Sequence, residues 1–192
     1  MLRRFARNFI KERTDSLKKD VNHCLTGDAT FPALLYCMST IYLLGELNSV
    51  DSKSDTTTNS ITYMQKLMGY TKAQTDLVMK LFRHKLVHLA QPRPIAVYPE
   101  DSANIVTWQY IHSDRKIHLI LEELPPKTKI QIIPGWEIEV NQRFTIGIWQ
   151  LVEDINNSVY RQGGFLDKLE QSQDLQTKFS NFIEGMYKVK NY

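Results

Sequence analysis

The first ninety residues carry hydrophobic side chains at the spacing of three to five positions that is typical of amphipathic helices. Residues 2–25 predict one such helix, with Phe5, Phe9 and Leu17 on one side and basic side chains spread over the others. Residues 31–48 predict a second helix that is apolar on nearly every face. Such a helix lies at the centre of a bundle or at a subunit interface.

A polar, low-complexity segment separates this pair from the next helices. Residues 48–60 are mostly Ser, Thr, Asn and Asp, whose side chains compete for hydrogen bonds with their own backbone, so we expect a loop. Ser60 is the expected N-cap of a short helix over residues 60–68, and Thr71 that of a long helix over residues 72–90. Because the helices on both sides cannot bury their faces alone, the loop is not expected to divide the chain into domains.

The long helix is expected to have a buried side and a polar side. At about 100° per residue, Phe82 and Leu86 fall on one apolar stripe, whereas Arg83, His84 and His88 fall on the opposite arc. Prolines that follow soon afterwards end the helix, so His88 is expected in or near its last turn.

After this helix the hydrophobic period changes to two, which predicts β-strands. The strand candidates are residues 105–111, 116–122, 129–133 and 136–140. Pro134 and Gly135 form a turn pair between the last two, and residues 91–104 are typical of an extended connector. We therefore expect a small antiparallel sheet or two hairpins, as a β insert over residues 105–140 between the long helix and the C-terminal helices.

Helical spacing returns in the last fifty residues. Residues 141–161 predict a helix with Asn141 as its N-cap, two glycines interrupt the pattern, and residues 165–187 predict a last amphipathic helix. The chain of 192 residues is thus expected to be one mainly α domain with a small β insert. Residues 165–192 are expected to be an added C-terminal helical element.

Composition and charge narrow the class of protein only a little. With 42% hydrophobic and 23% charged residues the chain can build a core, and its net charge of +3 is compatible with a polyanionic partner. The basic side chains of residues 2–25 fit either a solvated surface or one that guides a polyanion. No long apolar run follows the basic N-terminus, and residues 31–47 are too short and too polar for a membrane span. Neither a signal peptide nor a membrane contact is therefore expected.

The cysteines and the isolated histidines indicate no metal and no cofactor. Cys24 and Cys37 lack the spacing of a zinc site or of a disulfide scaffold, so we expect a reducing compartment and a cytoplasmic location. His23, His112 and His118 are expected to be structural residues, His23 and Cys24 have no obvious chemical partner, and the three tryptophans are expected in the core or the sheet. The chain has no glycine-rich phosphate loop and no hydrolase nucleophile motif.

Arg83 and His88 are the candidate catalytic pair. A histidine can both take and give a proton near neutral pH, and an arginine grips phosphate oxygens through its planar guanidinium. Together they suit attack of a ribose 2′-hydroxyl on the adjacent phosphate, which needs no metal. A polar helix surface would explain the same residues without any chemistry. Positions five apart also diverge by about 140° on a regular α-helix, so a site shared between two copies, or a distorted last turn, would be needed.

The segment from Leu81 to His88, LFRHKLVH, resembles the signature of HEPN domains (higher eukaryotes and prokaryotes nucleotide-binding), an Arg followed after four to six residues by a His. Family members commonly carry Asn, Asp or His directly after the Arg, and His84 fits that preference. The motif also lies late in a helix that follows an all-apolar helix. The resemblance covers the helical scaffold over about residues 2–161, and the β insert is larger than that of a minimal member.

The resemblance implies an up-and-down α-helical bundle and a homodimer in which two motif helices face each other. By the resemblance, His88 is the acid/base group, Arg83 the phosphate clamp and His84 an auxiliary polar group. Many members are metal-independent endoribonucleases of toxin–antitoxin, anti-phage or RNA-processing systems, and their cleavage leaves a 2′,3′-cyclic phosphate. The implied partners are an RNA substrate and an antitoxin or other protein, and no cofactor. Other members only bind, so a non-catalytic interaction domain is an alternative.

A DNA-binding regulator is the alternative from a different class. Residues 60–68, Gly69 and residues 71–83 have the length of a helix-turn-helix, and the strands at 105–111 and 116–122 would form its wing. The side chains at the DNA would be Lys72, Gln74 and Thr75, with Lys80, Arg83 and Lys85 at the phosphates. Against this, the second helix is expected to continue for more than a turn beyond residue 83, and the connector before the strands is long for a winged helix.

Overall fold

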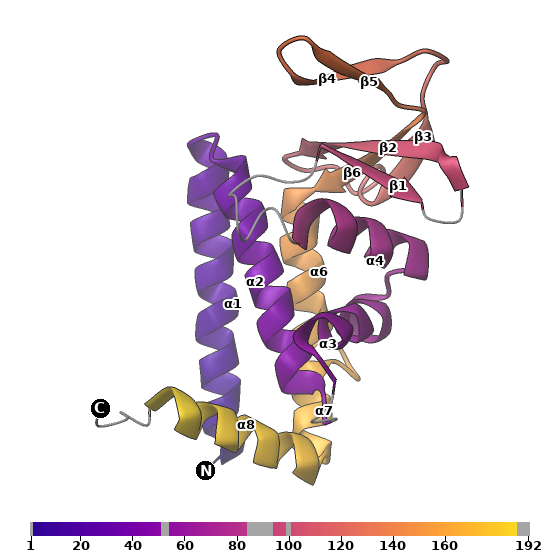
Figure 1. Ribbon diagram of the computed structural model, residues 1–192. Helices are drawn as coiled ribbons and strands as arrows, with labels where there is room; N and C mark the ends of the chain where they lie inside the picture. The colour runs from indigo at the N-terminus through magenta and orange to yellow at the C-terminus, as the bar shows by residue number, and fades with distance from the viewer. Residues whose placement is uncertain (1, 51–53, 84–93, 99–100, 188–192) are drawn as a thin grey trace, which may run out of the picture.

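The computed structural model describes residues 2–50, 54–83, 94–98 and 101–187. It shows a mainly α protein in which a helical body carries a small β region at one end (Figure 1). The two long N-terminal helices, α1 (Leu2–Thr26) and α2 (Thr30–Asn48), run antiparallel and confirm the helices expected at residues 2–25 and 31–48.

The C-terminal helices complete the helical body. α6 (Ile148–Tyr160) packs against both α1 and α2. α7 (Phe165–Gln171) and α8 (Gln173–Tyr187) lie at the end of the body that is farthest from the sheet (Figure 1). The single helix expected over residues 165–187 is therefore wrong. It is divided at Ser172, whose Oγ accepts a hydrogen bond from the Leu175 N–H at 3.3 Å and caps α8.

α2 is the central helix of the body. It contacts α1, α3, α6 and α8, which explains why the sequence leaves it without a polar face. The expectation that it is too short and too polar for a membrane span is not confirmed, because this 19-residue helix passes such a test by length and composition. The share of its most apolar window that is buried inside the protein is 56%.

α3 begins earlier than the sequence pattern predicts. It spans Thr56–Tyr63, and Asp55 is its N-cap, because Asp55 Oδ1 accepts backbone hydrogen bonds at 2.7 and 3.0 Å from the residues two and three positions further on. Ser60, the expected cap, is instead a buried residue within the helix. A Cβ atom at Gly45 of α2 would lie 2.8 Å from the Ser60 Cα atom, so this close helix crossing requires glycine.

The next helices change from α to π geometry along their length. α3 continues as η1 (Met64–Met68), and α4 (Lys72–Val78) continues as η2 (Met79–Arg83), both of which are π-helical. The regular helix expected over residues 72–90 is therefore α-helical only as far as Val78, and residues 84–90 lie outside the described residues.

A tight turn joins η1 to α4. Gly69 ends η1 with a left-handed φ of 77°, a conformation that glycine adopts without strain. Thr71 caps α4, as the sequence predicts, and it forms a capping box with Gln74. The Gln74 N–H donates to Thr71 Oγ1 at 3.2 Å, and the Thr71 N–H donates to Gln74 Oε1 at 2.9 Å.

The four-stranded sheet is mixed and has the strand order β1-β2-β6-β3. Its strands are β1 (Ile95–Tyr98), β2 (Asp101–Ile111), β3 (Ile120–Glu123) and β6 (Gln142–Gly147). The pairs β1–β2 and β3–β6 are antiparallel, but β2 and β6 are parallel. The expected purely antiparallel insert is therefore wrong, because β6 lies between the two strands that were expected to be neighbours.

The β region is also longer than expected, since it runs from residue 95 to residue 147 rather than over residues 105–140. Asn141 is not a helix N-cap, because its Oδ1 accepts a hydrogen bond from the Ile105 N–H at 2.8 Å within the sheet. The helix expected from residue 141 begins only at Ile148.

A separate hairpin lies beyond the sheet, on the side away from the helical body (Figure 1). It consists of β4 (Lys129–Ile133) and β5 (Trp136–Glu139), which pair antiparallel and confirm two predicted strands. Gly135 holds the expected turn with a φ of 81°. Trp136 is 55% exposed, so the expectation that it packs in the core or the sheet is wrong. Trp108 and Trp149 do pack against the core.

One hydrophobic core joins the helices to the inner face of the sheet. Its largest fully buried side chains are Tyr63, Phe82, Phe144, Phe165 and Phe179. Phe82 contributes from η2 and Phe144 from β6, so the end of the motif helix and the central strand are fixed against the same core.

Candidate functional site

The predicted catalytic residues lie at the edge of what the structure describes. Arg83 is the last residue of η2, and only its backbone belongs to the described part of the chain. His84 and His88 lie outside the described residues. The geometry that would bring Arg83 and His88 together is therefore an expectation from the sequence.

The residues directly before Arg83 are held firmly. Phe82 is completely buried, as its place at the centre of the apolar stripe predicts, and its ring centroid lies 5.3 Å from that of Trp108 in an edge-to-face contact. Leu81 is also completely buried. The helix is covered on more sides than a single stripe predicts, because η2 contacts both α2 and β1.

The helix that leads into the motif has π geometry over Met79–Arg83, the turn directly before the residues that separate Arg83 from His88. The divergence expected between positions five apart assumes a regular α-helix. In a turn closed by i→i+5 hydrogen bonds, residues five apart come nearer to the same face, and such turns often occur at functional sites. The described departure from α geometry therefore lies in the turn before the motif, and residues 84–88 lie outside the described residues.

The structure contains the two helices of the helix-turn-helix alternative. However, two of the three side chains that were expected to contact DNA bases are engaged within the protein. Thr75 is completely buried, and its Oγ1 donates to the Thr71 carbonyl oxygen at 2.9 Å. The Gln74 side chain donates to the Leu119 carbonyl oxygen at 3.2 Å in addition to its role in the capping box. Lys72 is exposed. The expected wing is also wrong, because β2 pairs with β1 and β6 rather than with residues 116–122.

The basic surface of α1 is partly neutralised. Arg7 pairs with Glu170 of α7 at 3.1 Å, and Lys11 pairs with Asp15 one turn further along α1. The Arg13 guanidinium lies 5.2 Å from the centroid of the Phe9 ring. These contacts favour a solvated helix surface over one that guides a polyanion.

A cluster of polar side chains lies at the junction of α4, the sheet and α6, and the sequence did not predict it. Its centre is Asp154 of α6, whose side chain is only 14% exposed. Asp154 Oδ2 accepts a hydrogen bond from the Tyr70 hydroxyl at 2.9 Å, and Asp154 Oδ1 accepts one from Arg115 Nη1 at 2.5 Å. Arg115 also donates to Glu153 Oε2 at 2.7 Å. We call Tyr70, Arg115, His118 and Asp154 the aspartate cluster.

His118 joins the aspartate cluster to the sheet. Its Nδ1 accepts a hydrogen bond from the Gly147 N–H at 2.9 Å, so the proton of the neutral ring is on Nε2. Nε2 lies 3.3 Å from Asp154 Oδ2, a contact that lacks the alignment of a hydrogen bond. The isolated histidine of the sequence is thus a buried structural residue, as expected.

The electrostatics of the aspartate cluster follow from burial and from its contacts. Burial alone would raise the pKa of Asp154, but the contacts with His118, Arg115 and Tyr70 outweigh it and hold that pKa below its usual value. Burial, together with the neighbouring Asp154 carboxylate, raises the pKa of the Tyr70 hydroxyl well above its usual value. Both groups therefore keep their charge state at neutral pH, which favours a structural role over proton transfer.

The described residues offer no metal centre. No group of three or more His, Cys, Asp and Glu side chains among them is arranged to hold a metal ion. Both cysteines are free thiols, and burial raises the pKa of the Cys37 thiol. Cys37 is therefore an apolar core residue at neutral pH, not an activated nucleophile.

Comparison with protein-family models, with curated proteins and with solved structures found no match to this chain.

Proposed function

We propose that this protein is a HEPN-like, metal-independent endoribonuclease that acts as a homodimer in the cytoplasm, in a toxin–antitoxin or phage-defence setting. Its RNA site would be formed by Arg83, His84 and His88 from two motif helices that face each other. An antitoxin or another protein would be its regulatory partner.

The observation that carries the proposal is the π-helical turn that ends at Arg83. The Arg-x4-His motif needs either two copies or a distorted turn, and the turn that leads into the motif already departs from α geometry. Burial of Phe82 against Trp108 gives the same turn a fixed orientation, which a catalytic arginine requires. The combination of motif, distortion and rigid support favours a site over a plain solvated surface.

The proposed reaction is an internal transfer within the RNA. His88 takes the proton of a ribose 2′-hydroxyl, and the 2′-oxygen attacks the adjacent phosphorus. The Arg83 guanidinium stabilises the negative charge that grows on the phosphoryl oxygens. The bond from phosphorus to the 5′-oxygen breaks, and an imidazolium of the dimer donates a proton to that oxygen. The products are a 2′,3′-cyclic phosphate and a 5′-hydroxyl.

The test is cleavage of a labelled single-stranded RNA by the full chain in EDTA, with the product ends identified. We expect cyclic phosphate ends and a loss of about 100- to 10,000-fold in rate for His88→Ala. We expect a loss of about 100- to 1,000-fold for Arg83→Ala. His112→Ala and Arg161→Ala are the matched controls, because both side chains are exposed elsewhere on the surface and should leave the rate unchanged.

Two results would contradict the proposal. One is wild-type protein that does not cut RNA under these conditions. The other is a His88→Ala variant that cuts as fast as wild type. A monomer in sedimentation equilibrium at the assay concentration would remove the shared site, and cleavage would then depend on the distorted turn alone.

One observation favours the DNA-binding alternative. Among the described residues, the β1–β2 hairpin follows the helical pair α3–η1 and α4–η2, which is the order of a winged helix. Such a protein should bind duplex DNA with an affinity that falls as salt rises. Lys72→Gln or Lys80→Gln should weaken that binding, while His88→Ala should not. A non-catalytic interaction domain would neither bind DNA in this way nor cut RNA.

A further inference from the structure

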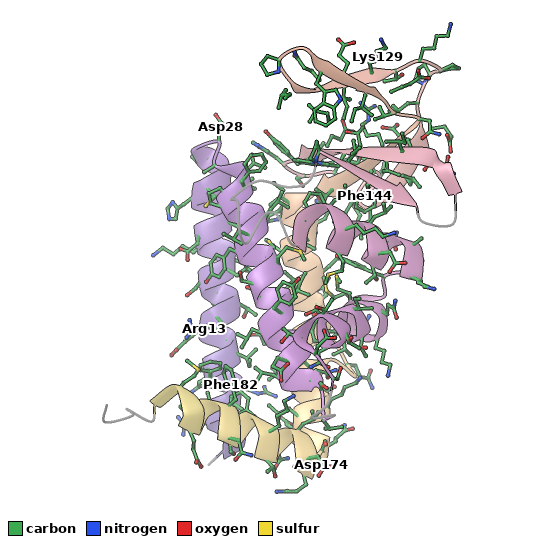
Figure 2. The ribbon with its side chains drawn as sticks, in the orientation of Figure 1. Arg13, Asp28, Lys129, Phe144, Asp174 and Phe182 are labelled. Carbon is green, nitrogen blue, oxygen red and sulfur yellow. The ribbon has the colours of Figure 1, made fainter. Side chains whose placement is uncertain are left out.

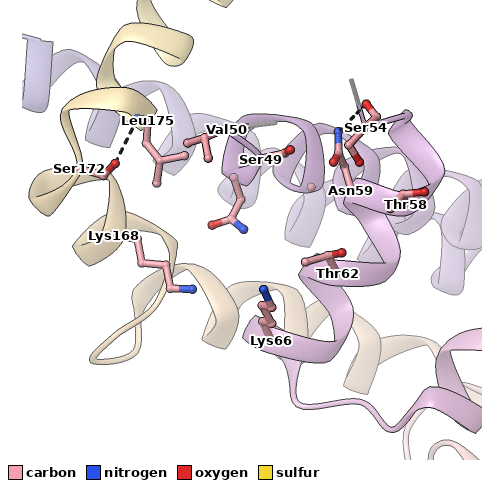
Figure 3. A pocket seen from close by; sticks show the side chains of 12 residues that line it. Ser49, Val50, Ser54, Thr58, Asn59, Thr62, Lys66, Lys168, Ser172 and Leu175 are labelled. Atoms are coloured by element: carbon pink, nitrogen blue, oxygen red, sulfur yellow. Dashed lines mark hydrogen bonds between the residues drawn. The ribbon is translucent and has the colours of Figure 1, made fainter. Parts of the chain in front are cut away.

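A hollow of about 480 Å³ opens between the C-terminal end of α2, the α3–η1 helix and the start of the C-terminal helices (Figure 3). This volume lies within the range of about 300–1,000 Å³ that is typical of small-molecule sites. The side chains that matter for its chemistry are those of Asn48, Thr62, Lys66, Lys168 and Ser172. We call it the lysine hollow.

Two lysines give the lysine hollow its charge. Lys66 comes from η1 and Lys168 from α7, and Figure 3 shows that both side chains extend into the space between these elements. Within the part of the chain that the structure describes, neither ammonium group has an ion-pair or hydrogen-bond partner. Two ammonium groups that face the same space repel each other and attract an anion.

No acidic side chain is among the described residues that line the lysine hollow. Three described carboxylates on the elements that form the hollow are already engaged. Glu46 accepts hydrogen bonds from Lys178 at 2.8 Å and from Asn59 at 2.9 Å. Asp55 caps α3, and Asp167 accepts the Gly163 N–H at 2.7 Å. No described carboxylate therefore neutralises the two lysines from within the hollow.

The other lining side chains are suited to hydroxyl groups. Thr62 carries a hydroxyl that, among the described residues, has no side-chain hydrogen bond. Asn48 carries an amide whose Oδ1 is buried without a hydrogen-bond partner among them. An unpaired buried polar atom is unfavourable, so Asn48 gains a hydrogen bond if its amide turns toward a hydroxyl group in the hollow. An anion that also bears hydroxyl groups fits this combination better than a bare ion does.

We propose that the lysine hollow binds a small phosphorylated molecule that carries hydroxyl groups, of the size of a nucleoside monophosphate. Its phosphate lies between Lys66 and Lys168, where a dianion neutralises both cations, and its hydroxylated part lies along Asn48 and Thr62. Lysine suits this task because its ammonium acts as a point charge toward phosphate. The proposal rests on residues other than the Arg-x4-His motif and is independent of ribonuclease activity.

The test is isothermal titration calorimetry of the full chain in a buffer free of phosphate, with AMP, ribose 5-phosphate and inorganic phosphate as probes and adenosine as the uncharged probe. We expect saturable binding of AMP and ribose 5-phosphate, and binding of adenosine that is weaker by about tenfold or more. Each of Lys66→Gln and Lys168→Gln should weaken AMP binding by about tenfold, and the double variant by about 100-fold.

Lys19→Gln is the matched control, because Lys19 is an exposed lysine of α1 that should leave AMP affinity unchanged. Thermal unfolding without probe shows that each variant is folded. Equal affinity of wild type and the double variant for AMP would overturn the proposal, as would the absence of binding to every phosphorylated probe at about 10 mM. A site that prefers a short RNA oligonucleotide and ignores AMP and ribose 5-phosphate would also overturn it.

Discussion

The aspartate cluster and the lysine hollow are both polar regions, but they differ in whether their charged side chains have partners within the protein. In the aspartate cluster, Asp154 accepts hydrogen bonds from Tyr70 and Arg115 and contacts His118. In the lysine hollow, two ammonium groups share a space to which no described carboxylate contributes (Figure 3). The first region satisfies its own charge, and the second does not.

The difference separates a polar region that holds the fold from one that is available to a ligand. A buried carboxylate with several partners links the segments that carry those partners, and it offers no free group to a substrate. Figure 2 shows that side chains fill the space between the helices and the sheet. Charge without a described partner at an open hollow adds little to folding and is available to an anion from outside the protein.

The largest effect is expected from Asp154→Asn. The substitution keeps the shape of the side chain but removes the negative charge to which Arg115 and Tyr70 donate hydrogen bonds. It should lower the free energy of unfolding by about 3 kcal/mol. Urea unfolding followed by circular dichroism measures it. Glu153→Gln is the control, because this half-exposed partner of Arg115 should cost less than about 1 kcal/mol. Equal losses in both variants would refute the central role of Asp154.

The next effect concerns the wall of the lysine hollow. Gly45→Ala places a Cβ atom 2.8 Å from the Ser60 Cα atom, so α3 must shift, and the free energy of unfolding should fall by about 2 kcal/mol. AMP affinity should fall as well, because Gly45 lines the hollow. Gly185→Ala is the control: its Cβ meets nothing within 4 Å on α8, so it should stabilise by about 0.5–1 kcal/mol. A neutral Gly45→Ala would contradict the close crossing of α2 and α3.

Acid should weaken the aspartate cluster. The lowered pKa of Asp154 means that its carboxylate stabilises the fold fully at neutral pH. This contribution is lost as the pH falls below about 3.9, the value of an unfolded aspartate, and through the lower pKa of the folded state. The free energy of unfolding should therefore fall more steeply with acid in wild type than in Asp154→Asn. Glu46 and Asp55 also have lowered pKa values but are present in both proteins. Parallel curves would refute this assignment.

The smallest effect is expected from the double variant Lys66→Gln/Lys168→Gln without ligand. Because neither lysine has a described partner, the free energy of unfolding should stay within about 0.5 kcal/mol of wild type. A loss larger than about 2 kcal/mol would mean that the two lysines hold the fold, and the contrast between the two regions would disappear.

Local patterns in the sequence were sufficient where a structure depends on neighbouring residues. The capping box at Thr71 and Gln74 could be predicted, because the residues that bond each other are three positions apart. The β4–β5 hairpin could be predicted from its turn at Gly135. The central place of α2 could be predicted because the sequence makes this helix apolar on nearly every face, and it contacts α1, α3, α6 and α8.

Distant pairing is what the sequence could not reveal. The spacing of Phe144, Ile148 and Leu151 fits a helix, yet Phe144 belongs to β6, whose parallel partner β2 lies far back in the chain. Tyr70 and Asp154 of the aspartate cluster are 84 positions apart. The walls of the lysine hollow likewise come from α2, α3–η1 and the C-terminal helices. Only the packing of these elements brings such residues together.

The place of β6 in the sheet has a consequence for synthesis. β6 pairs on both sides, with β2 and with β3, but it is the last strand to leave the ribosome. One edge of β2 therefore stays open while residues 112–141 are translated, which takes roughly 2–6 s at about 5–20 residues per second. An unpaired strand edge is a template for aggregation, so nascent chains stalled in this interval should be the ones that chaperones capture.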